Sequence, residues 1–102
     1  MDPKVKRIIK DIKSLKIQGA RNVAKSVVKA LIIQIENSKT RSLNSLYSEL
    51  LVVSDSLAAA RPTEPMVRNA IKDITDFTFM QIRSGKSVKQ IKKEVVIHNK
   101  EY

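Results

Sequence analysis

Two arginines at expected helix boundaries, Arg21 and Arg61, are the side chains of this sequence whose setting best suits a chemical role. Arg21 follows Gly19 and Ala20 where a helix should begin, and Arg61 stands before Pro62 in a stiff corner. Free backbone N–H groups and the helix dipole attract anions at a helix N-terminus, and glycine lets an anion come close. Guanidinium groups bind phosphate through paired hydrogen bonds. We therefore predict a phosphate site made of Gly19, Ala20, Arg21 and Arg61.

A purely structural interpretation of the same residues stays open. In that interpretation Gly19 only separates two helices, and the arginines are solvated or paired with Glu64, as exposed charges usually are at little gain in stability. The spacing of residues alone does not decide between the two interpretations.

Other kinds of chemistry lack their residues. The sequence has no cysteine, which excludes a thiolate nucleophile, thiolate metal ligands and disulfides within it, and His98 is the single histidine, with no second ligand at metal spacing. No acid and base flank a convincing nucleophile. We expect no catalytic residue, no bound metal, no cofactor, and no catalytic activity from this chain on its own.

The charge balance favours anionic partners. Lysine and arginine number 20 against 10 acidic residues, for a net charge of +10 over 102 residues. Six of these cations fall on the expected first helix: Lys4, Lys6, Arg7, Lys10, Lys13 and Lys16. They could follow a nucleic-acid backbone or form a solvated face. Aromatic residues make up only 4%, with no tryptophan, so few side chains could stack on bases, and nucleic acid is kept as an alternative partner.

Apolar residues recur at helical spacing in successive segments, each bounded by capping or breaking residues. We expect helices at about residues 3–16, 20–36, 43–60 and 64–83, and from 88 onward. The expected caps are Asp2, a side chain of the polar stretch 37–42, Thr63 and Ser87, the last in a capping box with Gln90. Short loops join antiparallel neighbours, so the fold class is all-α, an up-and-down bundle of four or five helices forming a single domain over residues 1–102.

The same periodicity predicts the core and the place of the loops. The expected core residues are Ile12, Val27, Leu31, Leu50, Leu57, Ile71 and Ile74. Helices of about 27 Å each, at about 1.5 Å per residue, would carry the chain out along the second helix and back along the third. Residues 19–22 and 61–63 would then meet at one end of the bundle.

Two segments of this sequence resemble a known family. The first is Ile12–Ala20 (IKSLKIQGA), followed by a helix rich in alanine and valine, and the second is Ala60–Pro65 (ARPTEP), which leads to Arg68, Asn69 and Ala70. They resemble the translation initiation factor 2B regulatory-subunit family of alpha, beta and delta subunits and their archaeal relatives. That family also contains ribose-1,5-bisphosphate isomerase and methylthioribose-1-phosphate isomerase. The resemblance covers nearly all of the sequence.

The resemblance implies the helical N-terminal domain of a longer, two-domain protein. In the family, a Rossmann-like C-terminal domain carries much of the oligomer interface and, in the isomerases, the catalytic cysteine and aspartate; that domain is missing from this sequence. In the isomerases an Arg-Gly-Ala segment and an Arg-Pro-Thr corner contribute to binding substrate phosphate. Gly19, Ala20 and Arg61 match this pattern, whereas Gln18 replaces an arginine and Arg21 is a displaced substitute.

The function that the resemblance favours is that of an initiation factor 2B-like protein. Such a domain would contact other subunits of the assembly and sense a small phosphate-containing ligand, since Gln18 can still donate a neutral hydrogen bond to phosphate. The alternative is the substrate-capping domain of a sugar-phosphate isomerase of the ribose-1,5-bisphosphate type. No apolar run approaches the roughly 20 residues of a transmembrane helix, and the charged N-terminus is unlike a signal peptide. We expect a cytoplasmic protein with no membrane partner.

Overall fold

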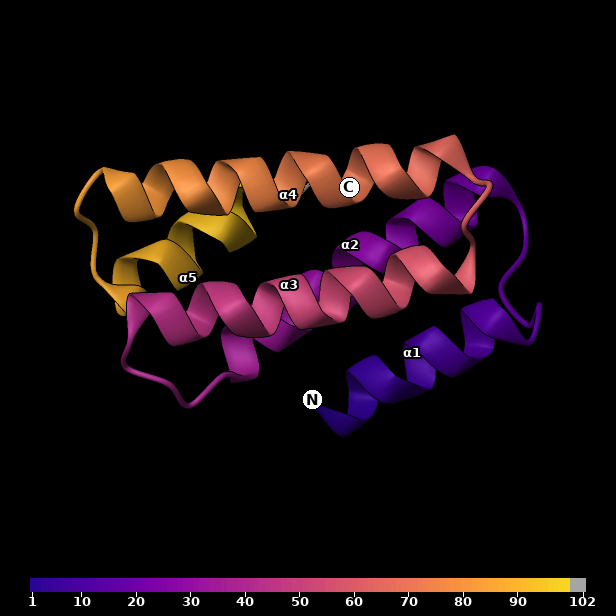
Figure 1. Cartoon of the computed structure of the whole chain (residues 1–102), viewed down its shortest axis with the longest axis horizontal. Helices are drawn as coiled ribbons and strands as arrows, with labels where there is room; N and C mark the ends of the chain where they lie inside the picture. Colours follow the sequence, from indigo (N-terminus) through magenta and orange to yellow (C-terminus); the bar gives the residue numbers. More distant parts are fainter. Residues whose placement is uncertain (100–102) are drawn as a thin grey trace.

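Capping residues and apolar stripes divide residues 1–99 into five helices (Figure 1). The computed structural model describes residues 1–99. The helices are α1 (Pro3–Lys13), α2 (Ala20–Asn37), α3 (Leu43–Ala60), α4 (Pro65–Arg83) and α5 (Val88–His98). Residues 1–99 contain no strand, so the prediction of an all-α bundle is confirmed.

Side-chain caps begin most of these helices as the sequence predicts. Asp2 accepts a hydrogen bond from the Lys4 N–H, Ser42 does the same for α3, and Ser87 and Gln90 form a reciprocal capping box. The prediction that Thr63 caps α4 is wrong. Glu64 is the cap, because Pro65 starts the helix and holds the residue before it in extended geometry (φ −95°, ψ 106°).

The first helix ends three residues earlier than the predicted Lys16. Leu15 has a positive φ of 67°, and its N–H donates to the Ile12 carbonyl (3.3 Å), while the Ile17 N–H donates to the Asp11 carbonyl (3.1 Å). These contacts satisfy carbonyls that the last turn of a helix leaves free. Helical spacing alone did not reveal this end, because the apolar pattern continues through Leu15.

The helices run up and down, so that α2 and α4 point the same way (Figure 1). The end of α1, the start of α2, the end of α3 and the start of α4 all lie at one end of the bundle, to the right in Figure 1. The predicted meeting of residues 19–22 and 61–63 at this end is therefore confirmed. At the other end, α5 packs against α4 and α2.

The core lies along α2, which has more buried residues than any other described helix. Six predicted core residues are fully buried: Ile12, Val27, Leu31, Leu50, Leu57 and Ile74. Ile71 is the exception, being only half-buried at the margin of the core. The buried stripe of α4 follows Val67, Ala70 and Ile74, and Ile71 stands one residue, about 100° of helical rotation, to the side of it.

A polar network fixes the start of α1. The Asp2 carboxylate accepts from the Asn37 side chain (3.0 Å), the Asp2 N–H donates to Gln34 Oε1, and Gln34 donates to the Glu49 carboxylate. The bond from Asn37 and that from the Lys4 N–H lower the pKa of Asp2 below its ordinary value of 3.8, since both stabilise the charged form.

No helix within residues 1–99 combines the length and apolar character needed to cross a bilayer.

The central position of α2 predicts a large cost for truncating Leu31. We expect Leu31→Ala to lower the free energy of unfolding by about 2–5 kcal/mol, since buried side-chain volume is lost. Leu51→Ala, at a position 41% exposed, is the control and should cost less than about 1 kcal/mol. Urea unfolding measures both variants, and equal stability of the two would contradict a core centred on α2.

Candidate phosphate-binding site

Arg61 joins two parts of the chain at the corner between α3 and α4. It follows the last residue of α3 and is half-buried. Its Nε donates to the Ile12 carbonyl at 3.3 Å, and its Nη2 donates to the Ile17 carbonyl at 3.1 Å. The first carbonyl is in the last turn of α1, where a cation also meets the negative end of the helix dipole. Arg61 therefore ties the α3–α4 corner to the connection between α1 and α2.

Gly19 is the N-cap of α2 and adopts a φ of +87°, which glycine tolerates far better than other residues. A Cβ here would come no closer than 3.7 Å to the Asn22 side chain, so the backbone conformation rather than lack of space calls for glycine. No side chain caps this helix, whereas each of the other four described helices has a side-chain cap. The first intrahelical bond runs from the Val23 N–H to the Gly19 carbonyl, which leaves the N–H groups of residues 20–22 facing out of the helix end.

Arg21 lies exposed on the first turn of α2. Within residues 1–99 it forms no ion pair, and neither arginine pairs with Glu64, whose carboxylate instead accepts from the Met66 N–H at the start of α4. The alternative in which Glu64 neutralises the arginines is therefore wrong. Glu64 also places a carboxylate at the N-terminus of α4, so of the two N-termini at this end only that of α2 has no acidic cap.

Gln18, which stands where the resemblance expects arginine, is used within the loop. Its side-chain Nε2 donates to the Leu15 carbonyl at 2.8 Å, and its backbone carbonyl accepts from the Asn22 side chain at 3.2 Å. Both contacts hold the α1–α2 connection in shape. The structure thus brings Gly19, Ala20, Arg21 and Arg61 to one end of the bundle, with Arg61 holding the loop and Arg21 extending from the helix.

A second feature near this end is a basic hollow on α1, of about 310 Å³, lined by Lys6, Arg7, Lys10, Asp11 and Lys16. Its four cations are among the six that could either contact nucleic acid or form a solvated face. The hollow includes Asp11, so its positive charge is partly offset. It has no aromatic residue on which a base could stack.

His98 lies far from these groups, near the end of α5. Its ring stacks on Phe77, with 3.8 Å between ring centroids, and its Nε2 is 3.8 Å from the Asp73 carboxylate. Both partners are on α4, so His98 helps to hold α5 in place. In the described part of the chain, no three histidine, aspartate or glutamate side chains lie close enough together to bind a metal.

Sequence comparison identifies the family of this chain. Residues 16–102 match the model of the initiation factor 2 subunit family. The chain belongs to this family. The match confirms the resemblance, and it begins within the α1–α2 connection, so it includes all of Gly19, Ala20, Arg21 and Arg61.

Two curated relatives from archaea are similar to the chain. It is 38% identical over 65 residues to a ribose 1,5-bisphosphate isomerase of Pyrococcus furiosus, an alignment that covers 64% of this chain and 20% of the relative. It is 28% identical over 98 residues to the enzyme of the same name from Thermococcus kodakarensis, covering 96% of this chain and 30% of the relative. The chain thus spans less than a third of the length of these relatives.

The bridge made by Arg61 predicts a difference between the two arginines in stability. Arg61→Ala should lower the free energy of unfolding by about 1–3 kcal/mol, because two hydrogen bonds from a charged donor are lost. Arg21→Ala removes the same charge from an exposed position and should change stability by no more than about 0.5 kcal/mol. Urea unfolding of both variants tests this, and an Arg61→Ala protein as stable as Arg21→Ala would show that the bridge contributes nothing.

Proposed function

We propose that this domain provides one wall of a phosphate-binding site and acts together with a second domain that completes it. The proposed contacts are the N–H groups at the start of α2, beside Gly19 and Ala20, and the guanidinium groups of Arg21 and Arg61. The observation that carries the proposal is the uncapped N-terminus of α2, held beside the α3–α4 corner by the Arg61 bridge. An anion there would accept hydrogen bonds that no side chain supplies.

Arg61 has a divided role in this proposal. A guanidinium carries five N–H donors, and the two bonds to Ile12 and Ile17 occupy only two of them. The others can reach a phosphate on the solvent side of the corner, while the bridge keeps the group in place. Arg21 is exposed and has no ion-pair partner among the described residues, so its guanidinium would contact the anion from the side of α2.

The function we favour for the parent protein is that of an initiation factor 2B-like subunit, in which this domain contacts neighbouring subunits and senses a phosphate-containing ligand in the cytoplasm. Membership of the initiation factor 2 subunit family supports this function and the isomerase alternative equally, because the family that the chain resembles contains proteins of both kinds. The use of Gln18 within the loop, in place of the arginine found in the isomerases, favours the initiation factor 2B-like function.

The second candidate is the substrate-capping domain of a ribose-1,5-bisphosphate-type isomerase. The activity for which both relatives are named favours it. The substrate named there carries phosphate, which is the group that the end of α2 suits. In either case we propose that this domain supplies binding groups and that catalytic groups, where there are any, belong to the rest of the protein.

The proposed site predicts weak and localised phosphate binding by this chain. In an NMR titration with inorganic phosphate we expect amide shifts at residues 19–22 and 61–63, with a Kd on the order of 1 mM or weaker, because only one wall of the pocket is present. Arg21→Ala and Arg61→Ala should each weaken binding more than Lys10→Ala, which removes one charge from α1. Arg61→Lys keeps the charge and loses the bridge. Comparing it with Arg61→Ala, which loses both, separates the two effects on phosphate binding.

The same titration discriminates between the alternatives. Shifts spread along the lysines of α1, with no response at residues 19–22, would contradict the site and favour a general polyanion surface. Repeating the titration with ribose 1,5-bisphosphate and with a nucleoside monophosphate compares the two parent functions. Tighter binding of the sugar bisphosphate would favour the capping domain of an isomerase.

A further inference from the structure

A second apolar face of α2, on the side where α5 packs, is only partly covered by residues 1–99. Helical spacing places six residues in one row along α2: Lys25, Val28, Lys29, Ile32, Ile33 and Glu36. Ile32 and Ile33 are only half-buried, whereas Val28 of the same row is buried and α2 supplies more core residues than any other described helix. A helix that is apolar on two faces normally buries both of them. This face therefore lacks part of its cover.

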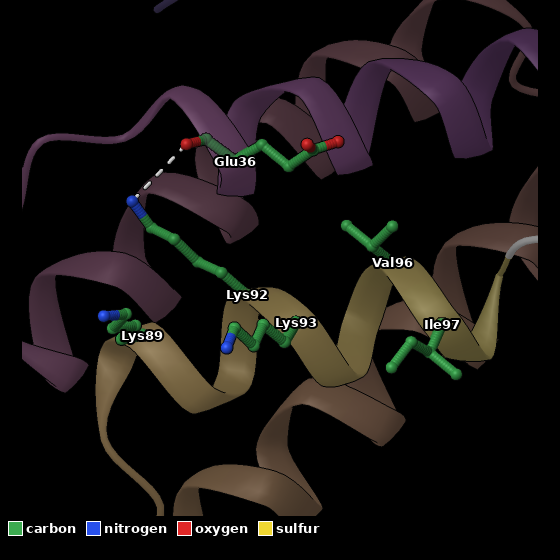
Figure 2. Close-up of a pocket in the computed structure, with 6 residues that line it drawn as sticks. All are labelled: Glu36, Lys89, Lys92, Lys93, Val96 and Ile97. Atoms are coloured by element: carbon green, nitrogen blue, oxygen red, sulfur yellow. Dashed lines mark hydrogen bonds between the residues drawn. The ribbon is translucent and has the colours of Figure 1, made fainter.

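A matching row runs along α5, through Lys89, Lys92, Lys93, Val96 and Ile97. The two rows enclose an open groove with hollows of about 470 and 410 Å³, both of which Glu36 borders. Figure 2 shows the end of the groove formed by α5, where Val96 points toward the last turns of α2. Ile97 is 67% exposed, the most exposed large apolar side chain of the described residues.

The rim of this groove is strongly basic. Five of its residues are lysines (Lys25, Lys29, Lys89, Lys92 and Lys93), against Glu36 as the one acidic residue among those that line the two hollows. Lys92 is used internally, since its Nζ donates to the carbonyls of Glu36 (dashed in Figure 2) and Ser38 at the end of α2. None of the five lysines forms an ion pair within residues 1–99, and Glu94 of α5 lies near Lys86 instead.

We propose that the groove between α2 and α5 binds an acidic amphipathic helix of a partner protein. The aliphatic floor fits the apolar stripe of such a helix, and carboxylates beside that stripe would meet the lysines on both rims. The row from Lys25 to Glu36 and the whole of α5 each extend about 16 Å at about 1.5 Å per residue, which accommodates roughly three helical turns. A nucleic acid would satisfy the lysines but would leave the aliphatic floor without a matching surface, since no aromatic residue lines the groove.

The position of this groove makes it independent of the phosphate site. It lies between α5 and the α2 face that begins at Lys25, whereas the phosphate site uses the first turn of α2 and the Arg61 corner. An experiment that disproves binding at one site therefore does not bear on binding at the other. In the parent protein the groove would serve assembly or recruitment of a partner.

The test uses a fluorescein-labelled synthetic peptide of about 15 residues, long enough for about four helical turns. It carries leucines at positions i, i+3, i+4 and i+7 and glutamates beside them, and a scrambled peptide of the same composition is its control. Fluorescence anisotropy should show saturable binding of the amphipathic peptide to the whole chain, with at least about tenfold weaker binding of the scrambled peptide. Equal binding of the two peptides would overturn the proposal.

Variants locate the binding. Ile97→Glu and the double change Lys89→Glu with Lys93→Glu should each weaken binding about tenfold or more, and all three substitutions fall at exposed positions. The matched control is Lys10→Glu with Lys13→Glu on α1, which changes the net charge equally and should change the Kd less than about twofold. Circular dichroism checks that each variant is folded. An equal loss in the α1 control, or displacement of the peptide from the groove by a single-stranded oligonucleotide that binds more tightly, would overturn the proposal.

Discussion

The contact on which the candidate site depends is the pair of hydrogen bonds from the Arg61 guanidinium to the Ile12 and Ile17 carbonyls. An isolated helix of 11 residues, the length of α1, is marginal in water, so tertiary contacts must hold it. At the start of α1, the Asp2 carboxylate accepts a hydrogen bond from Asn37 of α2. At the end of α1, the Arg61 guanidinium donates to the Ile12 carbonyl. The α1–α2 connection comes directly after the end of α1 in the chain, and its geometry sets where Gly19 and the start of α2 lie.

The bundle consequently has two ends of different character. At one end, the uncapped start of α2 lies near two arginines, while Glu64 occupies the start of α4. At the other, α5 leaves an aliphatic groove bordered by lysines, and the Lys92 side chain closes the end of α2. Besides the cations of α1, the positive charge thus gathers at two places, for which we propose a small anion at the arginine end and an acidic helix in the groove.

The elements were predictable where local chemistry decides them, as at the caps formed by Asp2 and Ser87. The end of α1 was not, because Leu15 fits the apolar spacing and yet adopts the left-handed conformation. The cap of α4 moved from Thr63 to Glu64, since the proline that follows fixes the start of the helix. The sequence predicted that residues 19–22 and 61 meet. It did not predict that Arg61 binds backbone carbonyls, because that contact joins residues 44 and 49 positions apart in the chain.

Amide hydrogen exchange in an Arg61→Lys variant tests most directly whether Arg61 organises this end of the bundle. The N–H groups of Leu15 and Ile17, which bond to Ile12 and Asp11, report on the connection, and that of Leu31 reports on the core. Loss of the bridge should speed exchange at Leu15 and Ile17 by about tenfold or more relative to Leu31, since it frees local opening without unfolding the core. Exchange that is unchanged at all three residues, or faster by the same factor at all three, would contradict a local organising role for Arg61.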